Sequence, residues 1–237
     1  MIAFLLTATF CAFAAPLDEG VTAFDEARLV EAVNHWSEVP AETRGWAVSY
    51  NLSLAKYRQG EVGEAIGLLR EAKLRSPRNG AVHHNLAYLR SELGAVPKPV
   101  DEARSWLNVM TAGELGAWSG LCGAAGLLIV FRRRRDPSLG ATGPWWLLWM
   151  AGSLGVLLSW DAAQQSVAHP VAVVTADEVA LRDAPVLDGA ARADLALGSE
   201  VRVAQCRTEW CLVEDGRSRR GWVSRHTLFV AHAESVD

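Results

Sequence analysis

Two long apolar runs on either side of one basic cluster constrain this 237-residue chain more than any other feature. Leu115–Phe131 and Pro144–Trp160 contain no Asp, Glu, Lys, Arg or His, and Arg132–Arg135 lies between them. Runs of this length approach the roughly 20 residues that a helix needs to cross a bilayer. Because Lys and Arg in short loops stay in the cytoplasm, the pattern predicts a transmembrane helical hairpin with a cytoplasmic tip. The alternative is a soluble helical hairpin with a basic loop.

Small residues and the absence of charges indicate what such a hairpin would do. Gly120, Gly123, Gly152 and Gly155 would let the two helices approach closely. Neither run offers an ionisable side chain for a proton or ion path, so the hairpin is interpreted as an anchor.

The segments outside the hairpin are polar, except at the N-terminus. Met1–Ala15 is apolar and has small residues at Ala12 and Ala14, which predicts a signal peptide ending at Ala14. An exported N-terminal segment agrees with the orientation that the arginines favour. The net charge of −4 argues against nucleic acid as a partner.

Cysteine and histidine placement restricts the chemistry further. Cys206 and Cys211 lie on the predicted exported side, where their spacing fits a disulfide across a tight hairpin; two free thiols are the alternative. They do not form a C-x-x-C motif and lack a set of partner ligands for a metal. His83 and His84 are sequence neighbours, which face apart on a helix, so no metal site is expected there.

A helical pattern from Trp46 to Gly94 repeats after 34 residues, which is the period of paired-helix repeats. This segment resembles a tetratricopeptide repeat, whose stacks bind extended or helical peptides in a concave face. The resemblance implies candidate contacts to backbone amides or a carboxylate from the repeated polar residues Asn51, Lys56, Asn85 and Arg90. Ordinary solvated helix faces are the alternative for these residues.

Partial repeats are expected on both sides of the complete one. Phe24–Leu29 resembles the second helix of a preceding degenerate repeat, and Gly80–Gly94 the first helix of a following one. A single complete repeat seldom stands alone, so about four helices are expected to pack together. Prolines at 97 and 99 then end the helical part, before a short amphipathic segment at 101–110.

After residue 169 short alternating apolar segments separated by glycines predict a small β-barrel. The segments Ala180–Pro185, Leu197–Val201 and Gly221–Val223 resemble a bacterial SH3 domain. The resemblance implies core or groove positions for Trp210 and Trp222, with the core favoured for Trp222. Some of these domains bind peptidoglycan, and many bind proteins or serve as packing modules.

The sequence shows no Ser/His/Asp or Cys/His set, phosphate loop or zinc spacing, so neither an enzyme nor a cofactor is expected. The order of the segments resembles the BatE-like proteins of the Bat (aerotolerance) operon family. That resemblance implies a non-catalytic, two-pass component of the bacterial inner (cytoplasmic) membrane, with its soluble domains on the periplasmic side. The implied partners are von Willebrand A-domain membrane proteins and a MoxR-type ATPase.

Two functions follow as hypotheses, a scaffold for protein partners and a peptidoglycan-binding sensor that uses the SH3 domain. The fold expected is multidomain: an all-α helical stack, two transmembrane helices and an all-β SH3-like barrel. The expected boundaries are signal peptide 1–14, tetratricopeptide region 17–96, linker 97–113, transmembrane helices 114–131 and 144–161 around a cytoplasmic loop 132–143, SH3 domain 170–231 and tail 232–237.

Overall fold

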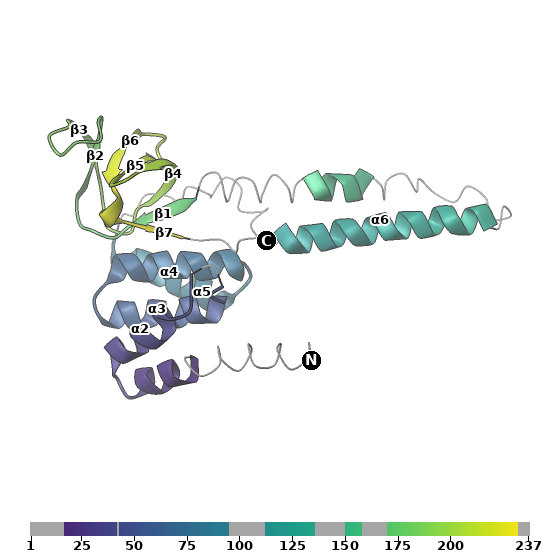
Figure 1. The fold of residues 1–237 in the computed structure, drawn as a ribbon, viewed down its shortest axis with the longest axis horizontal. Coiled ribbons are helices and arrows are strands. Elements are labelled where there is room, and N and C mark those ends of the chain that lie inside the picture. Colours follow the sequence, from purple (N-terminus) through teal and green to yellow (C-terminus); the bar gives the residue numbers. More distant parts are fainter. Residues whose placement is uncertain (1–16, 42, 95–111, 136–149, 158–169, 232–237) are drawn as a thin grey trace. The chain divides into compact units, whose positions relative to one another are not determined.

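The computed structural model describes residues 17–41, 43–94, 112–135, 150–157 and 170–231 (Figure 1). The predicted signal peptide, most of the linker, loop residues 136–143, residues 144–149 and 158–161 of the second predicted transmembrane helix, and the tail lie outside these residues. The chain divides into two compact units. The first joins the N-terminal helices to the C-terminal strands, and the second holds residues 106–168.

Antiparallel helices build the N-terminal part of the first unit. Helical residues 17–25 precede the helices α2 (Leu29–Ser37), α3 (Trp46–Arg58), α4 (Val62–Arg75) and α5 (Gly80–Glu92). Gly60 turns the chain between α3 and α4 with a φ of 86°, a conformation that glycine adopts without steric cost. Asn79 caps α5, because its side-chain oxygen accepts hydrogen bonds from the amides of Ala81 and Val82. These helices and turns agree with the periodicity of the sequence.

The junction before α2 differs from the prediction. Residues 26 and 27 form a turn in which Ala27 has a φ of 60°, so Phe24–Leu29 is a helix–helix corner rather than one continuous helix. At this corner Arg28 pairs with Glu26 and Glu31, and its amide donates a hydrogen bond to the Ala23 carbonyl. The helical spacing of this segment in the sequence is therefore misleading.

Two hydrophobic clusters hold the helices together. One surrounds the fully buried Trp36, and the other surrounds Ile66 and Leu69 of α4. Between them lies a polar network on Glu71, which is 0% exposed, accepts a 2.7 Å hydrogen bond from Ser49 and pairs with Arg75 at 2.5 Å. Such a charge is tolerated in the interior because it is both paired and hydrogen-bonded.

The C-terminal part of the first unit is a curved antiparallel sheet. Its strands are β1 (Val171–Val174), β2 (Val179–Arg182), β3 (Ala191–Leu195), β4 (Glu200–Arg207), β5 (Trp210–Asp215), β6 (Arg220–Ser224) and β7 (Leu228–Val230), in the order β3-β2-β6-β5-β4-β1-β7. Alternate residues of β2, β5 and β6 point into one core, which includes Leu181, Val213 and Val223. This barrel has the SH3-like character that the alternation predicts; β3 and β7 were not anticipated.

Asp215 closes the β5–β6 hairpin. Its carboxylate accepts hydrogen bonds from the amides of Arg217 and Arg219 and from the Arg219 guanidinium at 2.7 Å. Burial by itself disfavours ionisation of this group, but the hydrogen bonds from Arg219 and Arg217 outweigh it, so the pKa of Asp215 lies below its ordinary value.

The second unit corrects the membrane prediction. Its helix α6 (Ala112–Arg135) runs through the predicted loop residues 132–135, and residues 150–157 form a further helical segment in which Gly152 lies close to Ser119 and Cys122. Within the residues that the structure describes, no helix has the combination of length and apolar character that crossing a membrane requires. This finding overturns the predictions of two transmembrane helices and of a two-pass inner-membrane location.

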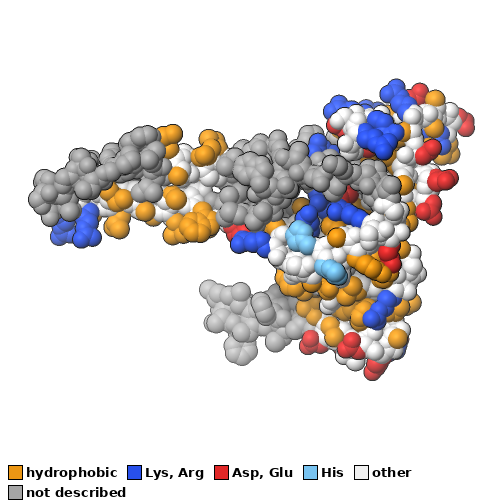
Figure 2. Space-filling view, turned by 180° about the vertical axis from the view of Figure 1, so that it is seen from behind, with side chains coloured by type: hydrophobic (Ala, Val, Ile, Leu, Met, Phe, Trp, Pro, Cys, Tyr) orange, Lys and Arg blue, Asp and Glu red, His pale blue; other side chains and the backbone are white. Residues whose placement is uncertain are grey.

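The composition of α6 explains the correction. The part of α6 between Glu114 and Arg132 would extend about 26 Å, short of a hydrocarbon core of about 30 Å. Four of its residues are glycines, which add no apolar surface. Large apolar side chains such as Leu121, Leu128 and Phe131 are nevertheless exposed on α6 (Figure 2).

Candidate binding surfaces

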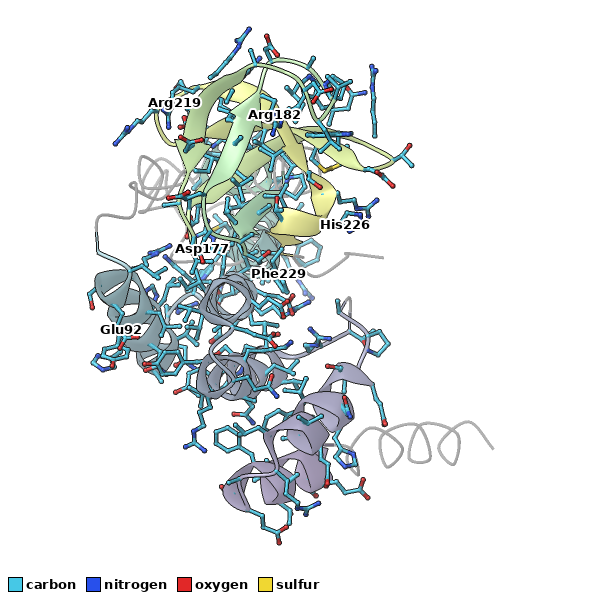
Figure 3. All side chains as sticks on the ribbon, turned by 90° about the vertical axis from the view of Figure 1, so that its left-hand side faces the viewer. Glu92, Asp177, Arg182, Arg219, His226 and Phe229 are labelled. Carbon is cyan, nitrogen blue, oxygen red and sulfur yellow. A yellow bond between two sulfur atoms is a disulfide. The ribbon has the colours of Figure 1, made fainter. Side chains whose placement is uncertain are left out.

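The helices and the barrel are in direct contact through α4, which was not expected from the sequence. Gly63 and Gly67, one helical turn apart, face the strands. A Cβ atom at Gly63 would lie 2.7 Å from the Cα of Thr175, and one at Gly67 would lie 2.4 Å from the ring of Phe229. Figure 3 shows Phe229 at this junction. The two glycines thus form a groove on α4 into which the barrel fits, and larger residues at these positions would separate the two parts.

A buried charge cluster crosses the same junction. Glu200 of β4 is 3% exposed and pairs with Arg90 of α5, while Arg70 of α4, 2% exposed, lies 4.0 Å from its other oxygen. Burial lowers the pKa of Arg70, and the negative charge of Glu200 opposes that effect. Glu200 therefore stabilises two arginines of the helical part from a strand of the barrel.

The polar residues predicted to bind a peptide make several contacts within the chain. Arg90 forms an ion pair with Glu200, and Lys56 forms ion pairs with Glu61 at 2.5 Å and Glu64 at 2.9 Å. Asn85 donates a 2.9 Å hydrogen bond to the hydroxyl of Tyr50. Asn51 is half-buried on α3. Three of the four thus make contacts within the chain, and both cations among them are ion-paired. Their role in peptide binding stays a prediction.

Aromatic side chains on α3 and α5 form a second candidate surface. Trp46, Tyr50 and Tyr57 share one face of α3 by their spacing, and Tyr88 with Glu92 shares one face of α5. Hydrogen bonds and a ring contact connect the two helices. We call these five residues, together with Asn85, the aromatic ledge. Its outer members Trp46 and Tyr88 are 40% and 48% exposed, so the ledge presents apolar and hydrogen-bonding groups to solvent.

One end of the ledge is a corner made by Tyr57, Tyr88 and Glu92. The two rings meet edge-to-face with their centroids 6.4 Å apart. Both hydroxyls donate to the Glu92 carboxylate, that of Tyr57 at 2.9 Å and that of Tyr88 at 2.7 Å. The hydrogen bond with Tyr88 and that with Glu92 raise the pKa of the Tyr57 hydroxyl above its ordinary value of 10.0. Figure 3 shows Glu92 on the outside of α5, away from the barrel.

The barrel has its own aromatic surface. Trp210 and Trp222 are half-buried and occupy outward positions of β5 and β6, outside the core cluster. Trp222 is paired across strands with Leu212 and Arg182, and the guanidinium of Arg207 lies 5.7 Å from its ring centroid. Of the two roles considered for Trp222, the structure therefore places it on a surface and not in the core.

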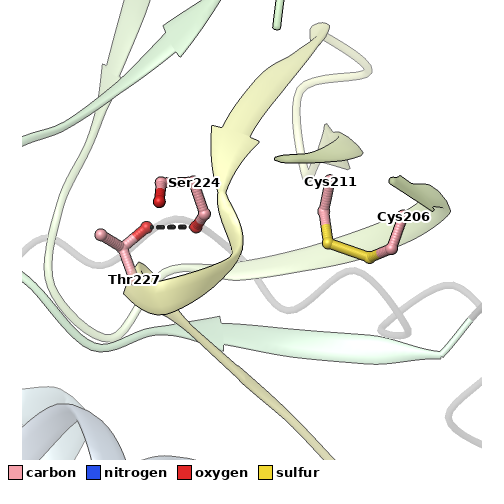
Figure 4. Close-up of a disulfide and its surroundings, with 4 residues drawn as sticks. All are labelled: Cys206, Cys211, Ser224 and Thr227. Atoms are coloured by element: carbon pink, nitrogen blue, oxygen red, sulfur yellow. Dashed lines mark hydrogen bonds between the residues drawn. A yellow bond between two sulfur atoms is a disulfide. The ribbon is translucent and has the colours of Figure 1, made fainter. Parts of the chain in front are cut away.

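Cys206 and Cys211 are joined by a disulfide in the structure (Figure 4). The two residues are direct partners in the β4–β5 register, with their Cα atoms 4.1 Å apart. Close by, the hydroxyl of Thr227 donates to the Ser224 carbonyl in the turn before β7. The bridge ties together the two strands next to the Trp222 surface.

His83 makes a contact with the turn that precedes its helix. A ring nitrogen of His83 lies 2.6 Å from the Pro77 carbonyl, a contact that links α5 to the turn before it. Among the residues that the structure describes, no group of three or more His, Cys, Asp and Glu side chains is arranged to hold a metal ion.

Comparison with known families identifies a bacterial SH3 domain at residues 175–229, a range that begins just after β1 and ends in β7. Modules of this kind bind proteins or peptidoglycan. Comparison with curated proteins and with solved structures gives no match. The resemblances to tetratricopeptide repeats and to BatE-like proteins gain no support from these comparisons.

Proposed function

We propose that this chain is a non-catalytic adaptor that binds protein partners through a single body made of the helical stack and the SH3 barrel. The observation that carries the proposal is the aromatic ledge. Tyrosine and tryptophan are the residues that contribute most to protein recognition, because they combine large apolar area with a hydrogen-bonding group. Here ring contacts and a hydrogen bond link them along α3 and α5, from Trp46 to Tyr88.

The packing of α4 adds to this proposal. Since Gly63, Gly67 and Glu200 join the barrel directly to the helices, a partner bound at the ledge is held at a defined distance from a partner bound by the barrel. An adaptor gains from such rigidity because the second contact then becomes intramolecular. The sequence resemblance supports a finer proposal, that the partners are von Willebrand A-domain proteins acting with a MoxR-type ATPase.

Site-specific photocrosslinking in the native host tests the proposal. A photoreactive residue is placed at Tyr88 on the ledge and, as a control, at Val30, which is 66% exposed on α2. We expect a discrete protein adduct from position 88 that is absent from position 30. Identical adduct patterns from the two positions, or no adduct from position 88, would refute the assignment of the ledge as a partner surface.

A second candidate function is peptidoglycan binding by the barrel. The observation that favours it is the outward Trp222 with the Arg207 guanidinium beside it and Arg182 across the strand, since sugars stack on indoles and stem peptides carry carboxylates. Retention of the full chain on purified sacculi tests this function. Wild type should be retained and Trp222→Ala should not, whereas Trp46→Ala should behave as wild type; passage of wild type through the sacculi excludes the function.

A further inference from the structure

We infer that the corner formed by Tyr57, Tyr88 and Glu92 is a subsite for a lysine or arginine side chain of the protein that binds the ledge. This inference rests on the proposed protein-binding function and specifies the chemistry of its ligand. It reverses the polarity expected from the sequence, where Lys56 and Arg90 suggested a carboxylate ligand.

The carboxylate of Glu92 is placed to receive a cation. Its hydrogen bonds within the described residues come from the neutral hydroxyls of Tyr57 and Tyr88, and no ion pair to it forms there. A carboxylate accepts about four hydrogen bonds, so the two tyrosines leave room for a further donor. They also fix the orientation of the group, which removes the side-chain entropy that an exposed Glu would lose on binding.

The two rings add a second attraction for the same ligand. A cation is attracted to the face of a tyrosine ring within about 6 Å of its centroid. Tyr88 is 48% exposed, and the edge-to-face contact with Tyr57 leaves ring surface open next to the carboxylate. A flexible alkyl stem ending in a positive charge matches this combination of apolar ring and acidic oxygen.

Two cations close in the sequence to the residues of the corner, Lys56 and Arg90, form ion pairs with other residues of the chain. Lys56 is held by Glu61 and Glu64 at the α3–α4 turn, and Arg90 is held by Glu200 at the barrel. Glu92 thus keeps its negative charge uncompensated among the described residues, and the charge complement of the corner is a basic ligand.

Fluorescence anisotropy with the full chain tests the inference. The probes are a labelled peptide of alternating lysine and alanine and the same peptide with every lysine Nε-acetylated, which keeps the length and removes the charge. We expect the lysine peptide to bind at least tenfold more tightly than the acetylated one at low ionic strength. Glu92→Gln should weaken it at least fivefold, whereas Glu38→Gln, an exposed acid on another surface, should change it less than twofold.

Each contrary result has a distinct meaning. Equal binding of the two peptides, no binding of the lysine peptide, or equal effects of the Glu92 and Glu38 substitutions overturns the basic subsite. If the Tyr88 crosslink persists in those cases, the protein-binding function stands without it. Loss of both the crosslink and the lysine preference would refute the function and the subsite together.

Discussion

Replacing Glu200 by Gln should destabilise the first unit strongly, because it removes a negative charge that offsets the burial of the Arg70 guanidinium. Removing one partner of a buried ion pair typically costs about 3–5 kcal/mol. Arg90, the second partner, is 22% exposed and regains water, whereas the Arg70 side chain is 3% exposed and does not. We therefore expect the lower end of the range, about 3 kcal/mol. The substitution also removes the charge that opposes the lowering of the Arg70 pKa.

Urea unfolding followed by tryptophan fluorescence measures this loss. With a slope of about 2 kcal/mol per molar urea, the midpoint should fall by about 1.5 M. Glu214→Gln is the matched control, since Glu214 is also a strand residue but pairs with Arg220, whose side chain is 69% exposed; it should cost less than about 1 kcal/mol. Adding Arg70→Met to Glu200→Gln should recover part of the loss. Equal midpoints for the Glu200 and Glu214 variants would refute the reasoning.

Three further predictions concern single groups in the same unit. Ser49→Ala removes a donor from the fully buried Glu71 and should lower the free energy of unfolding by about 1–3 kcal/mol in urea titrations. The pKa of Asp215 is lowered in the folded state, so the ionised carboxylate stabilises the fold above about pH 4, and this stabilisation is lost as the pH falls through the folded pKa. In Asp215→Asn, the free energy of unfolding should therefore fall less steeply with decreasing pH in the acid range. Replacing both Cys206 and Cys211 by Ser should cost about 2 kcal/mol, and calorimetry showing no change would contradict this.

Local patterns in the sequence predicted much of the secondary structure. The helical spacing after Trp46, the glycine at position 60 and the alternation in β2, β5 and β6 each involve only a few neighbouring residues, so the sequence alone predicts them. The disulfide could be anticipated for the same reason, since Cys206 and Cys211 are close in the sequence.

The candidate site could not be predicted in the same way because its contacts are distant in the sequence. Arg90 and Glu200 are 110 positions apart, and nothing in the sequence near Arg90 indicates that its guanidinium forms an ion pair with a residue of the barrel. The spacing of Gly63 and Gly67 was a usable signal, because two glycines one turn apart on a helix favour close approach of another backbone. Tyr88 and Glu92 share a helix face, but only the packing of α3 shows that Tyr57 joins them.

The membrane prediction was wrong because the uncharged run in α6 is short. Glu114 and Arg132 bound Leu115–Phe131, so a helix over this run extends about 26 Å, less than a hydrocarbon core of about 30 Å. The absence of charge within the run therefore did not by itself establish a membrane span.

Native-state hydrogen exchange most directly tests the claim that the helices and the barrel form one body. In low urea, the slowest amides of α4 and those of β1 should converge on the same free energy of opening, because Gly63, Gly67 and Glu200 couple them. Gly67→Val should lower both values together. If α4 and β1 open with different free energies, and the substitution changes only the helices, the two parts are independent and the account is contradicted.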